Sequence, residues 1–294
     1  MRHLLLTLLL TPLLHAQVTI RPEWTTPLPP FQIADNLYYV GSRDLAAYLI
    51  TTPQGDILIN SNLSSSPPLI RHAVEQLGFH WSDIKILLIG HAHSDHAGGS
   101  AQILRETHAK YMVMDADVPT VQSGGATDLL YPKDRYPSAH VDRVLHDLDT
   151  VTLGGVILTA HKTPGHTPGC TTWTFTTTQH GSPKQVVIVG GATTIDYRLA
   201  STPGHPATTP TIAADFQHTF DILHALPCDI FLGAHGIYFD MLAKLARANP
   251  AHPEAVWDDP ASYRAAIGHF EQAYLTTLHK QQAGGPPIRR VPHP

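Results

Sequence analysis

The sequence predicts an α/β fold of four layers, in which two β-sheets pack face to face and helices cover their outer surfaces. Two observations lead to this prediction. Each half of the chain runs through short apolar segments, then a segment with helical spacing, and then a short apolar strand. Helices with one apolar face must cover the face of a sheet. The chain has 294 residues, which is enough to bury the core of such a sandwich.

The first half begins with strands. Short apolar runs predict them at Asn36–Val40, Ala46–Thr51 and Asp56–Asn60. Pro53-Gln54-Gly55 predicts a hairpin turn between the last two strands. Apolar residues then recur at helical spacing over 69–77, and Gly78 follows them as a helix end prefers. The continuous apolar run Ile84–Ile89 is typical of a strand that is buried on both faces.

The second half repeats this order. Strands are predicted at Val151–Leu153, Val156–His161, Thr171–Thr176, Gln185–Val189 and Asp229–Leu232. Helical spacing over 216–226 predicts a helix before the last of these strands, and the spacing over 263–274 predicts another near the C-terminus. Two segments depart from the pattern. The proline-rich residues 21–31 predict an extended arm, and Pro119–Ser138 is long enough to suggest a flap over a functional site.

The N-terminus predicts a secretory signal peptide at residues 1–16. Arg2 supplies the positive start, Leu4–Leu14 is apolar but too short to span a membrane, and Ala16 is a small residue suited to cleavage. We therefore expect a periplasmic protein, with no membrane attachment after cleavage. Residues 17–282 are expected to form one domain, and residues 283–294 read as a disordered tail.

Composition excludes several classes of partner. Charged residues make up 15% of the chain, the net charge is -5 with histidine neutral, and no lysine or arginine run appears, so we expect no nucleic-acid partner. We expect the protein to act on a small-molecule substrate and to be a monomer. The two cysteines, Cys170 and Cys228, do not reveal whether they form a disulfide.

Residues 91–96 read His-Ala-His-Ser-Asp-His and directly follow the predicted strand Ile84–Ile89. Gly98-Gly99 and a helical run through Ile103 and Leu104 come next. Histidine nitrogen and carboxylate oxygen are ligands that zinc prefers. One ion cannot easily use four adjacent ligands of a tight turn. Two ions could use them, if alternate side chains point to opposite sides.

Further ligands are expected at the ends of later strands. His166 lies in Thr-Pro-Gly-His-Thr-Pro-Gly after the strand that ends at His161, and His235 lies in Gly-Ala-His-Gly after Asp229–Leu232. A lone histidine is usually an ordinary core or surface residue, and the other histidines of this chain keep that interpretation. The need for more ligands around zinc favours the metal for these two.

Together these motifs resemble those of the metallo-β-lactamase superfamily. The histidine loop alone marks the superfamily. Segments 36–41, 52–60, 117–125 and 239–281 are similar to subclass three of the class B β-lactamases, as are His96 in a ligand position and the lack of a cysteine ligand. The resemblance covers residues 32–282 and implies an αββα sandwich with the site along one edge.

The resemblance also implies the composition of the site. One Zn²⁺ would be held by His91, His93 and His166, and a second Zn²⁺ by Asp95, His96 and His235. The reaction implied is hydrolysis of the β-lactam amide of antibiotics by a metal-activated hydroxide, which Asp95 orients.

One segment departs from the subclass. Gly190-Gly191-Ala192 stands where the subclass usually has an aspartate and serines. Thr193 or Thr194 could replace a serine hydroxyl in holding a substrate carboxylate. The missing aspartate disfavours relatives that use it to bridge both metals.

Two alternatives stay open. One is another hydrolase of the same fold, acting on a lactone, thioester or phosphodiester. The other is a non-catalytic periplasmic zinc-binding protein, which the 21 histidines favour, although the predicted ligands are singular and lie at strand ends.

Overall fold

The computed structural model describes residues 20–284. The predicted signal segment 1–16 and most of the predicted tail 283–294 lie outside these residues. Among the residues described, no helix combines the length and the apolar character needed to cross a membrane.

The larger sheet has seven strands in the order β1-β2-β3-β4-β5-β6-β7. Their bounds are β1 Phe31–Ala34, β2 Leu37–Tyr39, β3 Tyr48–Thr52, β4 Gly55–Ile59, β5 Ile84–Leu88, β6 Lys110–Met114 and β7 Arg143–Leu145. The pairs from β1 to β4 are antiparallel, whereas β4 to β7 run parallel. Because parallel strands end at the same edge, the chain leaves β4, β5 and β6 on one side of the molecule.

The smaller sheet has five strands in the order β12-β11-β10-β9-β8. They are β8 Thr150–Leu153, β9 Val156–Lys162, β10 Thr171–Gln179, β11 Ser182–Val189 and β12 Ile230–Gly233. Only β11 and β12 pair in parallel. Backbone hydrogen bonds from Thr171 N to Gly90 O (2.7 Å) and from Ala46 N to Ala234 O (2.9 Å) tie the two sheets together at their common edge.

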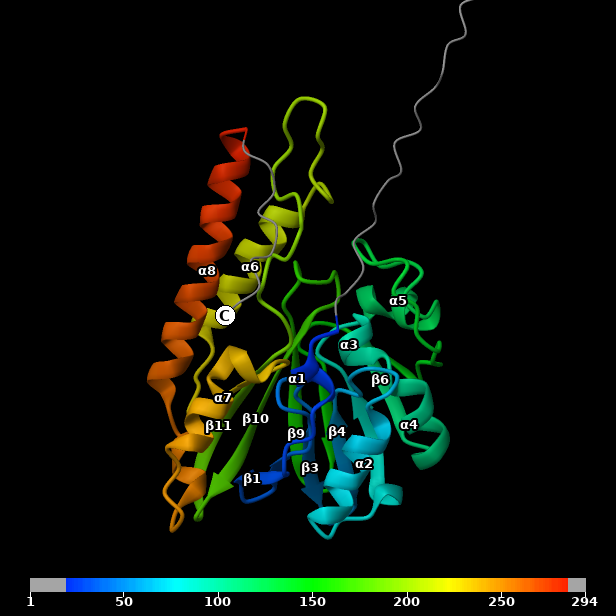
Figure 1. Cartoon of the computed structure of the whole chain (residues 1–294), viewed down its shortest axis with the longest axis vertical. Coiled ribbons are helices and arrows are strands. Elements are labelled where there is room, and N and C mark those ends of the chain that lie inside the picture. The colour runs from blue at the N-terminus through cyan, green and yellow to red at the C-terminus, as the bar shows by residue number, and fades with distance from the viewer. Residues whose placement is uncertain (1–19, 285–294) are drawn as a thin grey trace, which may run out of the picture.

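Helices cover both outer faces, which confirms the predicted four-layer αββα sandwich (Figure 1). Helices α2 Pro67–Gln76 and α4 Ser100–Thr107 lie on the larger sheet, and Ile70, Val74 and Ile103 pack there around Leu87 of β5. Helices α6 Ile212–Ala225 and α8 Pro260–Gln282 lie on the smaller sheet. The short helices are α1 Pro22–Thr25, α3 Ser94–Ala97, α5 Val118–Gln122 and α7 Met241–Ala246, with 3-10 turns at Trp81–Asp83, Asp115–Asp117, Gly236–Phe239 and Pro253–Trp257.

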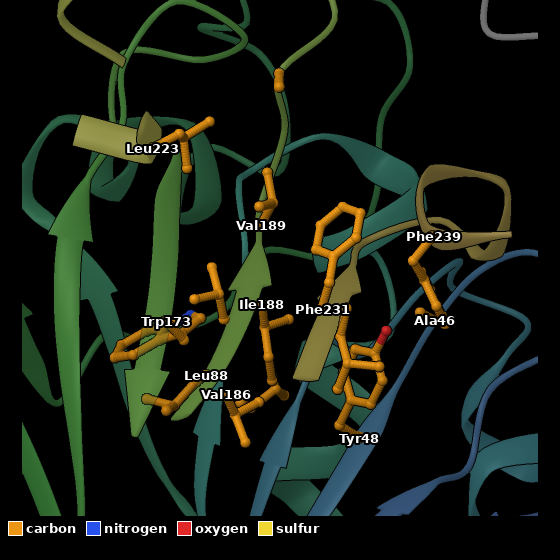
Figure 2. Close-up of a cluster of buried hydrophobic side chains, with 14 of the residues drawn as sticks. Ala46, Tyr48, Leu88, Trp173, Val186, Ile188, Val189, Leu223, Phe231 and Phe239 are labelled. Carbon is orange, nitrogen blue, oxygen red and sulfur yellow. The ribbon is translucent and has the colours of Figure 1, made fainter. Parts of the chain in front are cut away.

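The main core lies between the two sheets. Figure 2 shows Tyr48 and Leu88 of the larger sheet near Trp173, Ile188 and Phe231 of the smaller one, all of them buried. Leu87 faces the helices on the outside whereas Leu88 faces this inner core, so β5 is buried on both faces as predicted. Each fully buried side chain of this size contributes about 1.5–3 kcal/mol, which makes the sheet edge a rigid support for the loops that follow it.

Two predicted segments differ from the structure. Residues 21–31 are not wholly extended, because Pro22 starts the one-turn helix α1, in which both the backbone N–H and the hydroxyl of Thr26 donate to Pro22 O. The segment Pro119–Ser138 is not all loop, since α5 occupies its start. The strands β1, β6 and β7 and helix α7 were not predicted, and these three strands are defined by their pairing with β2, β5 and β6 rather than by their own pattern.

Candidate metal centre

The histidine loop lies at the carboxyl end of β5, where the backbone turns into α3. His93 still has an extended backbone, whereas Asp95 and His96 already lie within the helical turn Ser94–Ala97. The change from extended to helical backbone sends neighbouring side chains in different directions. The loop therefore presents two groups of potential ligands.

His91, His93 and His166 form the first of these groups, here called the first triad. One ligating atom from each lies within 4.8 Å of the others, and all three side chains are buried. The ring centroids of His91 and His166 are 4.5 Å apart, and each lies 4.8 Å from that of His93. His166 reaches this place from the turn between β9 and β10.

Asp95, His96 and His235 form the second triad. His96 Nε2 lies 3.5 Å from Asp95 Oδ2 and 3.2 Å from His235 Nε2, and His235 Nε2 lies 3.6 Å from Asp95 Oδ2. A tetrahedral ion with ligands at 2.0–2.1 Å separates its ligand atoms by about 3.3 Å, so this triangle has the size that such an ion requires. The ring centroids of His91 and His96 are only 4.2 Å apart, which places the two triads side by side.

Hydrogen bonds behind the triads set which ring nitrogens carry protons. Nδ1 of His91 donates to Gly190 O (2.9 Å) and Nδ1 of His166 donates to Thr193 O (2.8 Å). Their Nε2 atoms are thereby left as lone-pair donors. Nε2 of His91 is buried and has no hydrogen-bond partner among residues 20–284, so its lone pair fits a metal ion.

The protonation states of the site also suit metal binding. Burial, together with the charge of the neighbouring imidazoles, holds the pKa of His91 well below its ordinary value. Burial likewise lowers the pKa of His96 to about 3. Burial acts in the opposite direction on Asp95, but His96 and His235 outweigh it and lower the pKa of that carboxyl to about 2. At neutral pH the imidazoles of His91 and His96 are therefore neutral and the carboxylate of Asp95 is charged, as metal ligands must be.

Two aspartates that the sequence did not identify support the triads. Asp44 Oδ2 accepts from His235 Nδ1 (3.0 Å) and from Trp24 Nε1 (3.0 Å). Asp117 is buried and accepts from Ala92 N (2.9 Å), from the hydroxyl of Thr167 (2.8 Å) and from Gly169 N (2.8 Å). Asp117 thus joins the loop that carries His91 and His93 to the turn that carries His166.

The glycines at 190 and 191 give the site its room. A Cβ atom on Gly191 would lie 2.7 Å from Cδ2 of His166, and one on Gly190 would lie 2.2 Å from Thr171 O. A side chain at position 191 would therefore collide with the ring of His166, and the glycine that stands in this segment in place of larger residues lets His166 approach closely. Thr193, which was predicted to bind substrate, lies behind His166, with its hydroxyl oxygen 3.3 Å from Nδ1. Thr194 is half-buried beside it.

The predicted flap reaches the first triad. Asp128 Oδ2 lies 3.3 Å from His93 Nε2, and the ring of Tyr131 lies 5.5 Å from that of His93. The carboxylate favours a proton on Nε2 of His93, which leaves Nδ1 as the lone-pair donor. A cavity of about 130 Å³ adjoins this contact, between the flap on one side and Thr167 and Tyr197 on the other. The flap therefore borders the site directly.

The two cysteines are not joined. Cys170 is buried and donates to Gly191 O (3.5 Å), and Cys228 is half-buried elsewhere. Burial raises the pKa of the Cys170 thiol. The side chain beside Gly191 is therefore a protonated thiol and not a thiolate that could serve as a metal ligand.

Comparisons with known proteins agree with this geometry. Residues 43–177 match the family model of the metallo-β-lactamase superfamily. Among solved structures, the native FEZ-1 metallo-β-lactamase from Legionella gormanii is similar, with 46% identity, a TM-score of 0.80, and coverage of 88% of this chain and 98% of that one. BJP-1, a subclass B3 metallo-β-lactamase of Bradyrhizobium japonicum, shows 35% identity and a TM-score of 0.81, with 90% of this chain and 98% of that one covered. The class B3 di-zinc metallo-β-lactamase LRA-12 from an Alaskan soil metagenome shows 32% identity and a TM-score of 0.82, over 89% and 99% of the two chains.

Curated relatives match over shorter stretches. A probable metallo-hydrolase of Burkholderia pseudomallei is 33% identical over 94 residues, and a probable hydroxyacylglutathione hydrolase of Schizosaccharomyces pombe is 27% identical over 140 residues. These matches span 32% and 46% of the relatives' own lengths. The long matches to solved structures decide the family, and the chain belongs to the metallo-β-lactamase superfamily, with class B3 metallo-β-lactamases among its structural relatives.

Proposed function

We propose that this chain hydrolyses the amide bond of β-lactam antibiotics, with the first and second triads each holding one Zn²⁺. The observation that carries the proposal is the pair of triads themselves, set side by side at the sheet edge, with His91 close enough to Asp95 and His96 to form a further cluster with them. Support comes from structural relatives named metallo-β-lactamases that are covered almost completely by this chain.

Zinc is the metal that this ligand set favours. Five imidazoles and one carboxylate are borderline ligands that suit Zn²⁺ better than Mg²⁺ or Ca²⁺, which prefer oxygen. Three protein ligands in each triad leave positions open, as in catalytic rather than structural sites. When bound, such ions lower the pKa of a water ligand to about 7 and polarise a carbonyl.

The side chains around the triads have distinct parts in the proposed reaction. The carboxylate of Asp95 orients the attacking water and accepts its proton, which can pass to the ring nitrogen as the C–N bond of the lactam breaks. The hydroxyl of Thr193 or Thr194 holds the carboxylate of the substrate. Tyr131 and the rest of the flap, Pro119–Ser138, cover the bicyclic ring and exclude water.

The test is turnover of nitrocefin, a chromogenic cephalosporin, by the purified protein. Turnover should disappear with EDTA and return when Zn²⁺ is added back, and elemental analysis should find about two zinc ions per chain. A protein that holds two zinc ions but leaves nitrocefin, penicillins and carbapenems intact would refute the proposal.

A thioester hydrolase is the second candidate, because one curated relative is named a probable hydroxyacylglutathione hydrolase. Against it stands the segment Gly190-Gly191-Ala192, which lacks the aspartate that relatives of that kind use there to bridge both metals. A glutathione thioester assayed beside nitrocefin separates the two activities. A non-catalytic zinc-binding protein would turn over neither substrate.

Periplasmic location and a monomeric state belong to the same proposal. Export rests on residues 1–16, which lie outside the described residues. Intact-mass analysis of periplasmic protein should give a chain that begins near Gln17, and a mass that retains residues 1–16 would contradict export. Light scattering after gel filtration should give the mass of one chain.

A further inference from the structure

A second cluster of potential ligands lies far from the triads. It consists of His180, His252 and Glu254, and one ligating atom from each lies within 4.8 Å of the others. His180 occupies the turn between β10 and β11, and Glu254 belongs to the 3-10 turn Pro253–Trp257. Strand β10 starts at the triad edge and its nine residues span roughly 26 Å, so this cluster sits at the opposite end of the sheet.

The geometry points to a third metal site, and we propose that His180, His252 and Glu254 bind a late first-row divalent cation, for which Zn²⁺ is the probe. Without an ion, Glu254 Oε1 accepts a hydrogen bond from His180 Nε2 (2.5 Å) and lies 3.6 Å from His252 Nδ1, so a bound ion would replace that hydrogen bond and widen the first separation to about 3.3 Å. Two imidazoles and a carboxylate are the ligand set of many zinc sites. The two rings are 6.2 Å apart between centroids and stand at 85°, so both converge on one oxygen without stacking.

Hydrogen bonds that do not involve the ligand atoms hold this cluster together. The buried Gln179 donates from Nε2 to the backbone oxygen of Glu254 (2.9 Å), which joins the hairpin turn to the 3-10 turn. Asp35 accepts from the Thr178 hydroxyl (2.6 Å) and from His180 N (3.3 Å). The backbone of the site is therefore fixed before a cation binds, which lowers the cost of ordering the ligands.

Charge and access also favour a cation. Two carboxylates, those of Glu254 and the nearby Asp35, lie in or beside the cluster. The side chains of His180 and His252 are 68% and 66% exposed, so an ion reaches them from solvent and water can complete its coordination. An ion there would tie the hairpin turn to the segment before α8.

The experiment measures zinc per chain in the purified protein, equilibrated at micromolar free Zn²⁺, for the parent and for two variants. His180→Asn removes the imidazole, and asparagine adopts the left-handed backbone conformation of this position, where φ is 51°, more readily than most residues. His252→Ala removes the second ring. Each variant should bind one zinc ion fewer than the parent and should keep the parental rate of nitrocefin turnover.

The matched control is His224→Ala. His224 Nε2 forms an exposed pair with Glu271 (2.8 Å), and among the described residues His224 belongs to no group of three potential metal ligands. This variant should bind as much zinc as the parent. Equal zinc in the parent, His180→Asn and His252→Ala would show that the cluster is only an ion pair and would overturn the proposal. Because the readout is a difference between variants, it does not depend on which substrate the triads hydrolyse.

Discussion

The two triads differ in what stands behind them. In the first triad, His91 and His166 donate to the backbone oxygens of Gly190 and Thr193. In the second, His235 donates to the carboxylate of Asp44, and Asp95 is itself a member. The first triad therefore consists of imidazoles only, two backed by backbone oxygens and His93 by the Asp128 carboxylate, whereas the second triad contains a carboxylate and is backed by another.

This difference assigns different tasks to the triads. A cation among neutral imidazoles keeps more of its positive charge, which suits it to polarising a substrate carbonyl. A cation beside carboxylates is held more strongly by charge, and its affinity should depend on those carboxylates. The substitutions that follow remove one element of the contrast at a time.

Asp95→Asn should give the largest effect on activity. The second triad would lose its only anionic member, and the attacking water would lose its orienting base. We expect turnover to fall by about 10²–10⁴-fold, the range typical of a lost general base. The first triad keeps its own histidines, so metal analysis should still find about one zinc ion per chain. Parental turnover with full zinc would show that the second triad is wrongly assigned.

His166→Ala tests the neutral triad. Three ligands fall to two, so the first ion should be lost while the second is kept. The loss of a Lewis acid that contributes several kcal/mol should lower turnover by roughly a thousandfold. Zinc analysis beside a nitrocefin assay checks both expectations. Circular dichroism should match the parent, because the sheets bury their apolar faces without this side chain.

The histidine loop was predictable from sequence because its signals are local. The apolar strand β5, the turn and the three histidines are adjacent in the chain, and strand ends locate His166 and His235 as well. The four layers followed from the same apolar patterns. Strands such as β7, with three residues, were missed because sheet neighbours rather than their own sequence define them.

The supporting carboxylates could not be predicted, because tertiary structure alone brings them to the site. Asp44 is 191 residues from His235, and Asp117 is 25 residues from Ala92 and 50 from Thr167. Asp44 lies in no motif, and the similarity of segment 117–125 to the subclass does not reveal what Asp117 contacts. The close approach of His166 to Gly191 is likewise a product of packing between the sheets.

Asp44→Asn should have a smaller effect, confined to the second triad. The amide keeps the shape of the side chain but not the charge that fixes the proton on Nδ1 of His235. Loss of such a partner typically weakens metal binding by about 10–100-fold. Titration with a competing chelator should show this for one of the two ions. Trp24→Phe, which removes one of the other donors to Asp44 but keeps Ile237 N and an aromatic ring beside His235, is the matched control and should leave both affinities near those of the parent.

Asp56→Asn should give the smallest effect. It compares Asp95, whose charge is stabilised by neighbouring histidines, with a buried carboxylate whose charge is not stabilised in this way. Asp56 is buried at the start of β4, away from both triads, and burial raises the pKa of its carboxyl to about 6. A raised pKa means that the folded state prefers the protonated acid. The stability that this preference provides is complete below about pH 4 and is lost as the pH rises through 6.

The amide of Asp56→Asn stays neutral at every pH and can still accept a hydrogen bond from the backbone of Thr52. We therefore expect Asp56→Asn to stabilise the fold at pH 7 by about 1 kcal/mol, or roughly 2–4 °C in melting temperature, and to have no effect at pH 4. The control Asp221→Asn, on the exposed face of α6, should change neither value. A loss of stability at pH 7 in Asp56→Asn would mean that this carboxylate, like Asp95, is held in its charged form by the folded protein.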